Sequence, residues 1–337
     1  MTRRERLSAT FARQPTDRPP YAVWRHFPTV DGSPAGLAQA TLRFHERYGS
    51  DFLVLVPPEG WAVAAWGCEE AEEAGHDGRR PCARHAVREA EDWRRIRAVD
   101  PAGAPGYQEQ LETIVRLGFD RRLGDAPVLL ALSAPLTLAG RLAGPRLPVD
   151  CWERPAVVAD ALAALTDTTL RWVEAVLAEG IAGVFYVITG ASRTLLPEEA
   201  YAELGEPADR RVLEAIGARS ALVVIHARGD RLAFDRLARL PAQAWSWDAR
   251  TTAPSLADGL ARVPGAVVGG LDARGALRDG SAAAAVAEAQ EAIAETGGTG
   301  LVVAPGDVLW PNTPDDTVAA VIRALGGRPT PILGVTR

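Results

Sequence analysis

Short apolar runs alternate with longer amphipathic stretches along most of the chain. The amphipathic stretches include 155–178 and 281–296, which are long enough for helices that connect parallel strands. Continuous apolar runs are typical of parallel strands buried on both faces. Eight such runs occur, at 21–24, 51–56, 127–132, 183–188, 221–225, 242–247, 266–270 and 300–304. Alternating strands and helices in this number predict an α/β fold, a single (β/α)8 TIM barrel over residues 1–337.

One long interruption separates the second and third apolar runs, at residues 57–126. Its central part, 69–97, is polar and rich in Glu and Arg. A structureless loop of this length is rare in a compact domain, so we expect an insertion that contains helices. Because the insertion follows a strand, it should project on the face of the barrel that carries active sites and could act as a lid.

The composition is that of a globular protein, because 47% of the residues are hydrophobic and 24% are charged. The chain contains no lysine, which excludes a Schiff-base lysine and the lysine of a phosphate-binding P-loop. The formal net charge is −6 and the basic residues form no stripe, so nucleic acid is not an expected partner.

The cysteines and the apolar segments of the sequence indicate the cellular compartment of the protein. Cys68, Cys82 and Cys151 are too few and too irregularly spaced for a disulfide framework, which favours a reducing compartment. The first residues lack the apolar stretch of a secretory signal, and no later segment offers about 18 uncharged apolar residues. We therefore expect a cytoplasmic protein without a membrane partner.

Polar residues that directly follow the apolar runs are the first candidates for a site. Active sites of such barrels lie at the C-terminal ends of the strands, so these side chains should converge at one mouth. Together they predict a pocket that binds an anionic ligand and transfers protons. The candidates are Arg25, Thr189, His226, Asp248, Asp272 and Asp307.

Five of the six candidates have a structural alternative. Arg25 could grip a substrate carboxylate with its guanidinium fork, or form an ion pair at the barrel rim. His226 could bind a metal or relay a proton, or be an interior histidine bonded to the backbone. Asp248 and Asp272 could cap the helices that follow them. Asp307 lies in a Gly/Pro turn, where aspartate is common for conformational reasons.

A further group of soft or borderline metal ligands lies in the insertion, at His76, Cys82 and His85. Structural zinc sites usually present CxxC pairs, whereas this CxxH stretch has no second pair. A solvated loop is therefore the better interpretation of this segment.

Four segments resemble the uroporphyrinogen decarboxylase superfamily, in the same order and over roughly residues 3 to 326. TDRPPYAVWR at 16–25 is similar to the N-terminal x-D-R-P-P-x-x-x-x-R signature, and APLTLA at 134–139 to the A-P-W-T-L segment. GLD at 270–272 resembles the G-N-L-D-P element, and NTP at 312–314 the closing P-x-T-P-x-x-N turn. The family comprises (β/α)8 barrels that remove acetate carboxyl groups from a tetrapyrrole or move methyl groups between corrinoid proteins and thiols.

The resemblance implies where the decarboxylase site would lie, and most of its residues are replaced. Arg25 matches the first of two substrate-binding arginines, but Pro58 stands in the place of the aspartate that binds pyrrole N–H groups. Proline has no acceptor side chain for that role. The other replaced positions are the second arginine, the tyrosine, the serine and the closing histidine, which are here Thr29, Arg141, Thr189 and Asp307.

The methyltransferase branch is similar to this chain after the fifth and eighth strands, where it carries H-x-C-G and A-P-G-C. The equivalents are HARG at 226–229 and APGD at 304–307, so Arg228 and Asp307 replace both zinc-binding cysteines. Thiol activation by zinc needs closely placed soft ligands, and a guanidinium group would put positive charge beside the metal. We therefore expect no metal and no bound cofactor.

The resemblance and the residues together indicate an enzyme of this superfamily, methyltransferase-like in its loops, that acts on an anionic small molecule or a tetrapyrrole-like or corrinoid-linked substrate. One alternative is a uroporphyrinogen decarboxylase with a rearranged site, and another is a barrel that binds without catalysis. The family implies a homodimer. We predict proton transfer by His226 and Asp307, and substrate binding by Arg25, Arg228, Thr189, Asp248, Asp272 and Arg141.

Overall fold

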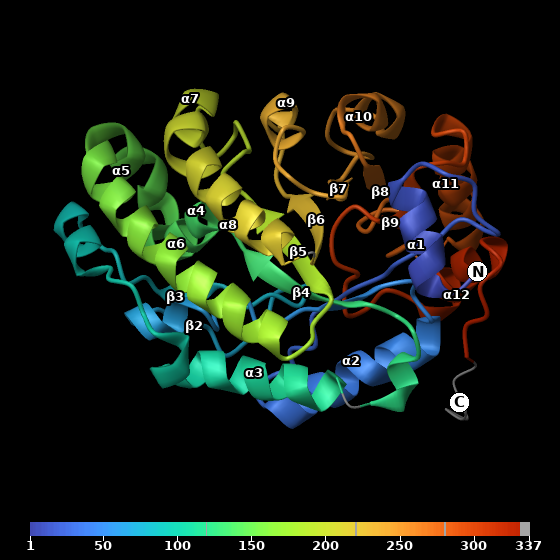
Figure 1. The fold of residues 1–337 in the computed structure, drawn as a ribbon, viewed down its shortest axis with the longest axis horizontal. Coiled ribbons are helices and arrows are strands. Elements are labelled where there is room, and N and C mark those ends of the chain that lie inside the picture. The colour runs from blue at the N-terminus through green and yellow to red at the C-terminus, as the bar shows by residue number, and fades with distance from the viewer. Residues whose placement is uncertain (119, 220, 280, 331–337) are drawn as a thin grey trace.

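A curled parallel sheet of seven strands forms the centre of the molecule, and helices surround it (Figure 1). The computed structural model describes residues 1–118, 120–219, 221–279 and 281–330, so the predicted domain end at 337 lies outside the described residues. The strand order is β1-β4-β5-β6-β7-β8-β9, and every neighbouring pair in it is parallel. This confirms an α/β fold that resembles a TIM barrel.

Seven of the eight apolar runs form the strands of this sheet. Their alternation with helices follows from the sequence pattern, because crossover helices cover the outer face of parallel strands. The strands are β1 (Leu53–Leu55), β4 (Val128–Ser133), β5 (Gly183–Ile188), β6 (Leu222–Ala227), β7 (Ala244–Ser246), β8 (Ala266–Leu271) and β9 (Leu301–Pro305).

The first apolar run, 21–24, is the exception to the predicted set of eight strands. It forms a single parallel bridge from Tyr21 to Val303 in β9 rather than a strand. The main chain of this run nevertheless forms hydrogen bonds to β9 on one side and to the residues before β1 on the other. Ala22 N donates to Val303 O at 3.1 Å, and Asp51 N, just before β1, donates to Tyr21 O at 2.8 Å.

Twelve α-helical segments occur in the described residues. The predicted helix 155–178 coincides with α6, and 281–296 contains α11. The segments are α1 (Arg3–Phe11), α2 (Pro34–Tyr48), α3 (Pro105–Gly118), α4 (Pro135–Ala143), α5 (Leu147–Glu153), α6 (Pro155–Ala178), α7 (Glu198–Ala200), α8 (Glu206–Ala218), α9 (Phe234–Leu237), α10 (Leu256–Arg262), α11 (Ala282–Glu295) and α12 (Asp315–Ala324). No helix in the described ranges is long and apolar enough to cross a membrane.

Residues 57–126 contain less helix than their length suggests. The polar stretch holds an antiparallel hairpin of β2 (Glu69–Glu70) and β3 (Cys82–Arg84), which the sequence reading missed. Short 3-10 turns precede α3, which packs against α2 and serves as the crossover helix between β1 and β4. The hairpin is therefore the part that departs from a simple βα unit.

Two apolar clusters lie on opposite faces of the sheet. Along β5, Phe185 belongs to the inner cluster while Val184 and Tyr186 belong to the outer one, because successive side chains of a strand point to opposite faces. The inner cluster also takes Trp24 from the first apolar run and Val224 from β6. The crossover helices pack on the outer cluster, whereas α1 contributes Leu7 to the inner cluster, which forms the floor beneath the strand ends.

The carboxylate of Asp51 connects α1, the segment before Tyr21 and the start of β1. It is completely buried, and its Oδ1 accepts from Arg6 Nη1 at 2.6 Å and from Arg18 Nη2 at 2.9 Å. Its Oδ2 accepts from Arg18 Nη1 at 2.8 Å and from Tyr21 N at 2.9 Å. Asp17 pairs with Arg6 at 2.7 Å. The D-R pair of the N-terminal signature thus supports the fold.

A second buried carboxylate, Asp209 on α8, faces two tyrosines. Tyr186 donates to its Oδ1 at 2.9 Å and Tyr201 to its Oδ2 at 2.8 Å. All three residues are inaccessible to solvent. Burial raises the pKa of Asp209 to about 7, although both hydrogen bonds act in the opposite direction. This carboxyl group therefore gains its proton far more readily in the folded protein than in the unfolded chain.

Replacing Asp51 by Asn should lower the free energy of unfolding by about 3–5 kcal/mol, because it leaves the Arg6 and Arg18 guanidinium groups without their buried carboxylate. Urea denaturation checks this loss. The control is Glu112→Gln, which breaks an exposed pair with Arg116 and should cost less than about 0.5 kcal/mol. Equal losses of unfolding free energy in both variants would contradict this structural role of Asp51.

Replacing Asp209 by Asn should remove a pH dependence from stability. Because the folded pKa of about 7 exceeds the ordinary 3.8, the contribution of Asp209 is fully present below pH 4 and is lost as pH rises to 7. The loss is on the order of 4 kcal/mol at roughly 1.4 kcal/mol per pH unit. Unfolding of both proteins from pH 4 to 8 measures it. In the exposed control Asp235→Asn, the free energy of unfolding should change with pH as in the wild type. If it changes in the same way in Asp209→Asn, the pH dependence does not come from Asp209.

Candidate active site

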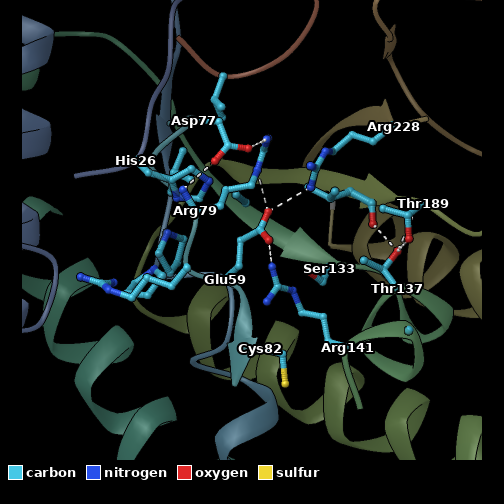
Figure 2. A pocket seen from close by; sticks show the side chains of 18 of the residues that line it. His26, Glu59, Asp77, Arg79, Cys82, Ser133, Thr137, Arg141, Thr189 and Arg228 are labelled. Atoms are coloured by element: carbon cyan, nitrogen blue, oxygen red, sulfur yellow. Dashed lines mark hydrogen bonds and ion pairs between the residues drawn. The ribbon is translucent and has the colours of Figure 1, made fainter. Parts of the chain in front are cut away.

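A cavity of about 700 Å³ opens at the C-terminal ends of the parallel strands (Figure 2). Ser133 ends β4, His226 lies one residue before the end of β6, and Thr189 directly follows β5. The hairpin between β2 and β3 contributes Asp77, Arg79 and Cys82 to the same cavity. The position matches the face at which barrel enzymes carry their sites.

An apolar wall forms one part of the cavity. Trp24 and Phe185 pack with ring centroids 4.8 Å apart, and the ring of Phe185 stacks on His226 at 4.8 Å. Val56, Val187 and Trp61 also line the cavity, and Trp61 packs against Tyr107 and Trp172 behind it. Such a wall suits the hydrocarbon or aromatic body of a ligand.

Three guanidinium groups converge on one carboxylate, that of Glu59 (Figure 2). Arg79 Nε and Arg228 Nη1 each lie 2.9 Å from Glu59 Oε1, and Arg141 Nη2 contacts Glu59 Oε2. Burial and the neighbouring Arg228 lower the pKa of Arg141 to about 10, which still leaves it charged at neutral pH. Three positive charges thus surround the carboxylate of Glu59.

Asp307 supplies a second carboxylate at the base of the cavity. Arg79 Nη2 donates to its Oδ1 at 2.5 Å, and Arg228 Nε lies 3.8 Å from the same oxygen. Burial alone would raise the pKa of Asp307, but Arg228, His226 and Arg79 outweigh it and hold the pKa well below its usual range. Asp307 is therefore ionised at neutral pH.

Two histidines at the site are neutral at neutral pH. Burial lowers the pKa of His226 despite the opposing effect of Asp307, whose Oδ1 lies 3.7 Å from His226 Nε2. His226 Nδ1 lies 3.1 Å from Ser246 Oγ, which fixes the ring. Burial, together with Arg79 and Arg228, lowers the pKa of His26 to about 3. A neutral imidazole beside an ionised carboxylate is equipped to accept a proton.

The structure brings together five of the eight predicted site residues at the main cavity, namely Thr189, His226, Arg228, Asp307 and Arg141. Asp248 lies in an adjoining cavity of about 250 Å³, which shares Thr189, Arg228 and Asp307 with the main one. Thr189 Oγ1 donates to Thr137 Oγ1 at 3.2 Å, so its hydroxyl is tied to α4.

Arg25 and Asp272 line neither cavity, contrary to the prediction of one shared mouth. Along the extended first segment, Trp24 and His26 face the cavity, so the intervening Arg25 turns outward. Its guanidinium group lies over Phe27, and Nη2 donates to Pro311 O at 3.2 Å. Asp272 Oδ1 accepts from the backbone N–H groups of Arg274 and Gly275 at 2.8 Å in the turn after β8. It does not cap the next helix, because the N-cap of α11 is Ser281.

Sequence reasoning missed five charged or titratable residues of the cavity: His26, Glu59, Asp77, Arg79 and Arg80. Glu59 is the first charged residue after the 51–56 run, so the rule of strand ends, which selects polar residues that follow each apolar run, could have found it. His26 is the neighbour of the residue that the rule selected. No signal in the sequence indicated Asp77 or Arg79, because a hairpin in a polar stretch brings them to the site.

The group at His76, Cys82 and His85 does not assemble into a metal site. His76 stacks on Trp310, and His85 Nδ1 lies 2.8 Å from the carbonyl oxygen of Arg141. Across the described residues, no three His, Cys, Asp or Glu side chains come close enough together to hold a metal ion. Cys82 lies in β3, so part of this segment is a strand of the hairpin rather than the expected loop.

The sequence matches the family model of uroporphyrinogen decarboxylase over residues 2–327. A methyltransferase from Methanosarcina mazei has a similar structure, with a TM-score of 0.79 at 19% identity over 97% of this chain and 98% of that one. A B12-independent methionine synthase from a Shewanella species, in complex with selenomethionine, gives a TM-score of 0.55 at 11% identity over 92% and 91%. No curated protein matches the sequence.

The residues present do not fit the thiol-activating zinc ion of the methyltransferase branch. His226 and Asp307 remain at the relevant positions, but a catalytic zinc normally takes three protein ligands. Arg79 already donates to Asp307 Oδ1 at 2.5 Å, and Arg228 lies 3.8 Å from that oxygen. Two permanent positive charges against the same carboxylate oppose the binding of a cation.

The purified protein should contain far less than one zinc ion per chain, because the family positions keep two ligands, His226 and Asp307, and the carboxylate of Asp307 is already paired with Arg79. Elemental analysis measures the content. The double variant Arg228→Cys, Asp307→Cys should bind zinc tightly, since it restores two thiolates beside His226 and removes one guanidinium group. About one zinc per wild-type chain, lost on His226→Ala, would overturn this expectation.

Proposed function

Because the chain belongs to the uroporphyrinogen decarboxylase family, we propose that it is an enzyme that holds an anionic small molecule with Arg79, Arg141 and Arg228 and acts on it by methyl transfer. The observation that carries the proposal is the convergence of three guanidinium groups inside one partly apolar cavity. Arginine binds carboxylates through fixed, paired donors and keeps its charge when buried.

Methyl transfer is favoured by the similarity to a methyltransferase and a methionine synthase. In the proposed step, an acceptor atom of the substrate forms a bond to the methyl carbon, and the bond between that carbon and its donor breaks. The donor, a methylated corrinoid in our proposal, keeps the bonding electron pair. The proton of the acceptor passes to His226 Nε2, and the ionised Asp307 stabilises the resulting imidazolium.

Decarboxylation is the second candidate, because the same arginines would bind carboxylate groups and the family model is that of a decarboxylase. In that reaction the bond from carbon to carboxylate breaks, CO2 leaves, and the carbon takes up a proton. Pro58, which has no acceptor side chain, counts against the uroporphyrinogen reaction in its usual form.

We also propose that the chain is one domain in which the first segment completes an eight-stranded barrel and residues 57–126 cover its mouth. The bridge from Tyr21 to Val303 and the bond from Asp51 N to Tyr21 O support the first point. The ion pair from Arg79 on the hairpin to Asp307 after β9 supports the second. This pair would open when the hairpin moves.

The proposal is tested by incubating the protein with methylcobalamin and carboxylate-bearing thiols, amines and phenols, and separately with uroporphyrinogen. We expect loss of methylcobalamin absorbance and a methylated product by mass spectrometry. Arg141→Gln should then lower kcat/KM by about 10- to 100-fold, mainly through KM, because one charge-assisted contact contributes roughly 1.5–3 kcal/mol. Arg116→Gln on the surface of α3 is the control and should leave kcat/KM unchanged.

CO2 release from uroporphyrinogen without methyl transfer would replace the first candidate by the second. Binding of carboxylates without turnover of either substrate would leave a binding protein and contradict both reactions.

A further inference from the structure

Glu59 occupies the place that the substrate's anionic group needs. It lies in the turn after β1, while its three arginine partners come from elsewhere: Arg79 from the hairpin, Arg141 from α4 and Arg228 from the segment after β6. Figure 2 shows its carboxylate between these guanidinium groups. All four side chains line the main cavity and remain partly accessible, with exposed fractions from 12% to 25%.

We infer that Glu59 is an internal competitor for the anion site, and that the carboxylate of the ligand displaces it and takes over its contacts with Arg79, Arg141 and Arg228. The inference rests on the proposed function, which places an anionic ligand in this cavity. It goes further in assigning the ligand a carboxylate or similar planar anion at one defined position. It also makes Glu59 a determinant of affinity.

The charge balance around Glu59 supports this exchange. Arginine cannot lose its proton at any relevant pH, so three guanidinium groups in one cavity require a counter-anion at all times. Asp307 and Asp77 pair with Arg79, but the contacts of Arg141 and Arg228 with a carboxylate at hydrogen-bonding distance are those with Glu59. A ligand carboxylate can supply the same charge and the same acceptors. The exchange therefore leaves no guanidinium group unpaired.

The local backbone permits Glu59 to leave. Within the described residues, neither the N–H nor the C=O group of Glu59 takes part in a main-chain hydrogen bond, whereas Trp61 N and Ala64 N bond to its neighbours Pro58 and Gly60. Within the same residues, no backbone N–H group donates to the Glu59 carboxylate, so rotation of the side chain would break the three ion pairs with arginine and no hydrogen bond to the main chain. In contrast, the similarly paired Asp51 is fully buried and also accepts from a backbone N–H group, so it has no freedom of this kind.

Competition of this type lowers apparent affinity, because the ligand binds only the fraction of molecules in which the arginines are free. Removing the charge of Glu59 should increase that fraction. A neutral Gln at the same position keeps the size of the side chain but gives the arginines a weaker partner. Asp keeps the charge but is one methylene shorter, so it should reach fewer of the three guanidinium groups.

The experiment uses 2-naphthoate as the probe, an aromatic carboxylate suited to the apolar wall and the arginines, and its neutral analogue 2-naphthamide as the matched ligand. Calorimetric titration of the full-length protein gives the affinities. We expect Glu59→Gln to bind 2-naphthoate at least about 10-fold more tightly than the wild type, and Glu59→Asp to lie between them. The affinity for 2-naphthamide should not change.

Two further variants locate the effect. Glu69→Gln removes the same charge from an exposed position on the hairpin and should bind like the wild type. Arg141→Gln added to Glu59→Gln should abolish the gain, because it removes one of the freed guanidinium groups. Glu59→Asp keeps the test decisive if Glu59→Gln does not fold, which circular dichroism and thermal unfolding check.

Each other outcome has a defined meaning. If the wild type binds 2-naphthoate and neither Glu59 variant binds it more tightly, Glu59 is not a competitor, although the anion site stands. An equal gain for 2-naphthamide would assign the effect to space rather than charge and would also overturn the inference. If no variant with all three arginines binds 2-naphthoate, both the inference and the proposed anion site are wrong.

Discussion

A buried guanidinium group needs a carboxylate partner, and this requirement organises the molecule at two places. Arginine is the only basic side chain besides histidine in this chain, and it stays charged wherever the fold puts it. Near the N-terminus, Arg6 and Arg18 enclose the carboxylate of Asp51. At the cavity, arginines from three separate elements enclose Glu59 and Asp307. In both places, charge pairing holds together segments that are distant in the sequence.

The two carboxylates differ in their burial and in the groups that they bind. Asp51 is inaccessible and binds two arginines and the backbone of Tyr21, so nothing from solution can replace it. In the described part of the chain, Glu59 binds side chains alone, and its contacts border a cavity of about 700 Å³. The same interaction is therefore structural just before β1 and, in our proposal, available to a ligand just after β1. Burial decides which role it takes.

The sequence predicted the repeating part of the fold well, since apolar periodicity reports on burial against a neighbouring layer. Seven of the eight apolar runs are strands, and α6 has the bounds that the pattern indicated. The rule of strand ends placed His226 and Asp307 together correctly. It failed for Arg25, since a shift of one residue in an extended segment reverses the direction of a side chain. It could not supply Arg79, whose position depends on a hairpin in a stretch without apolar periodicity.

The replacement of both family cysteines is consistent with the charges that surround Asp307. A zinc ion would bring positive charge and open coordination positions to the space between His226 and residue 307. In this chain Arg79 and Arg228 bring positive charge to the same carboxylate. Guanidinium groups can hold and orient an anion, but they offer no coordination position in which a thiol could lose its proton to a metal. The site therefore offers charge to an anion without a coordinating metal, and in the proposed function the neutral imidazole of His226 removes the proton.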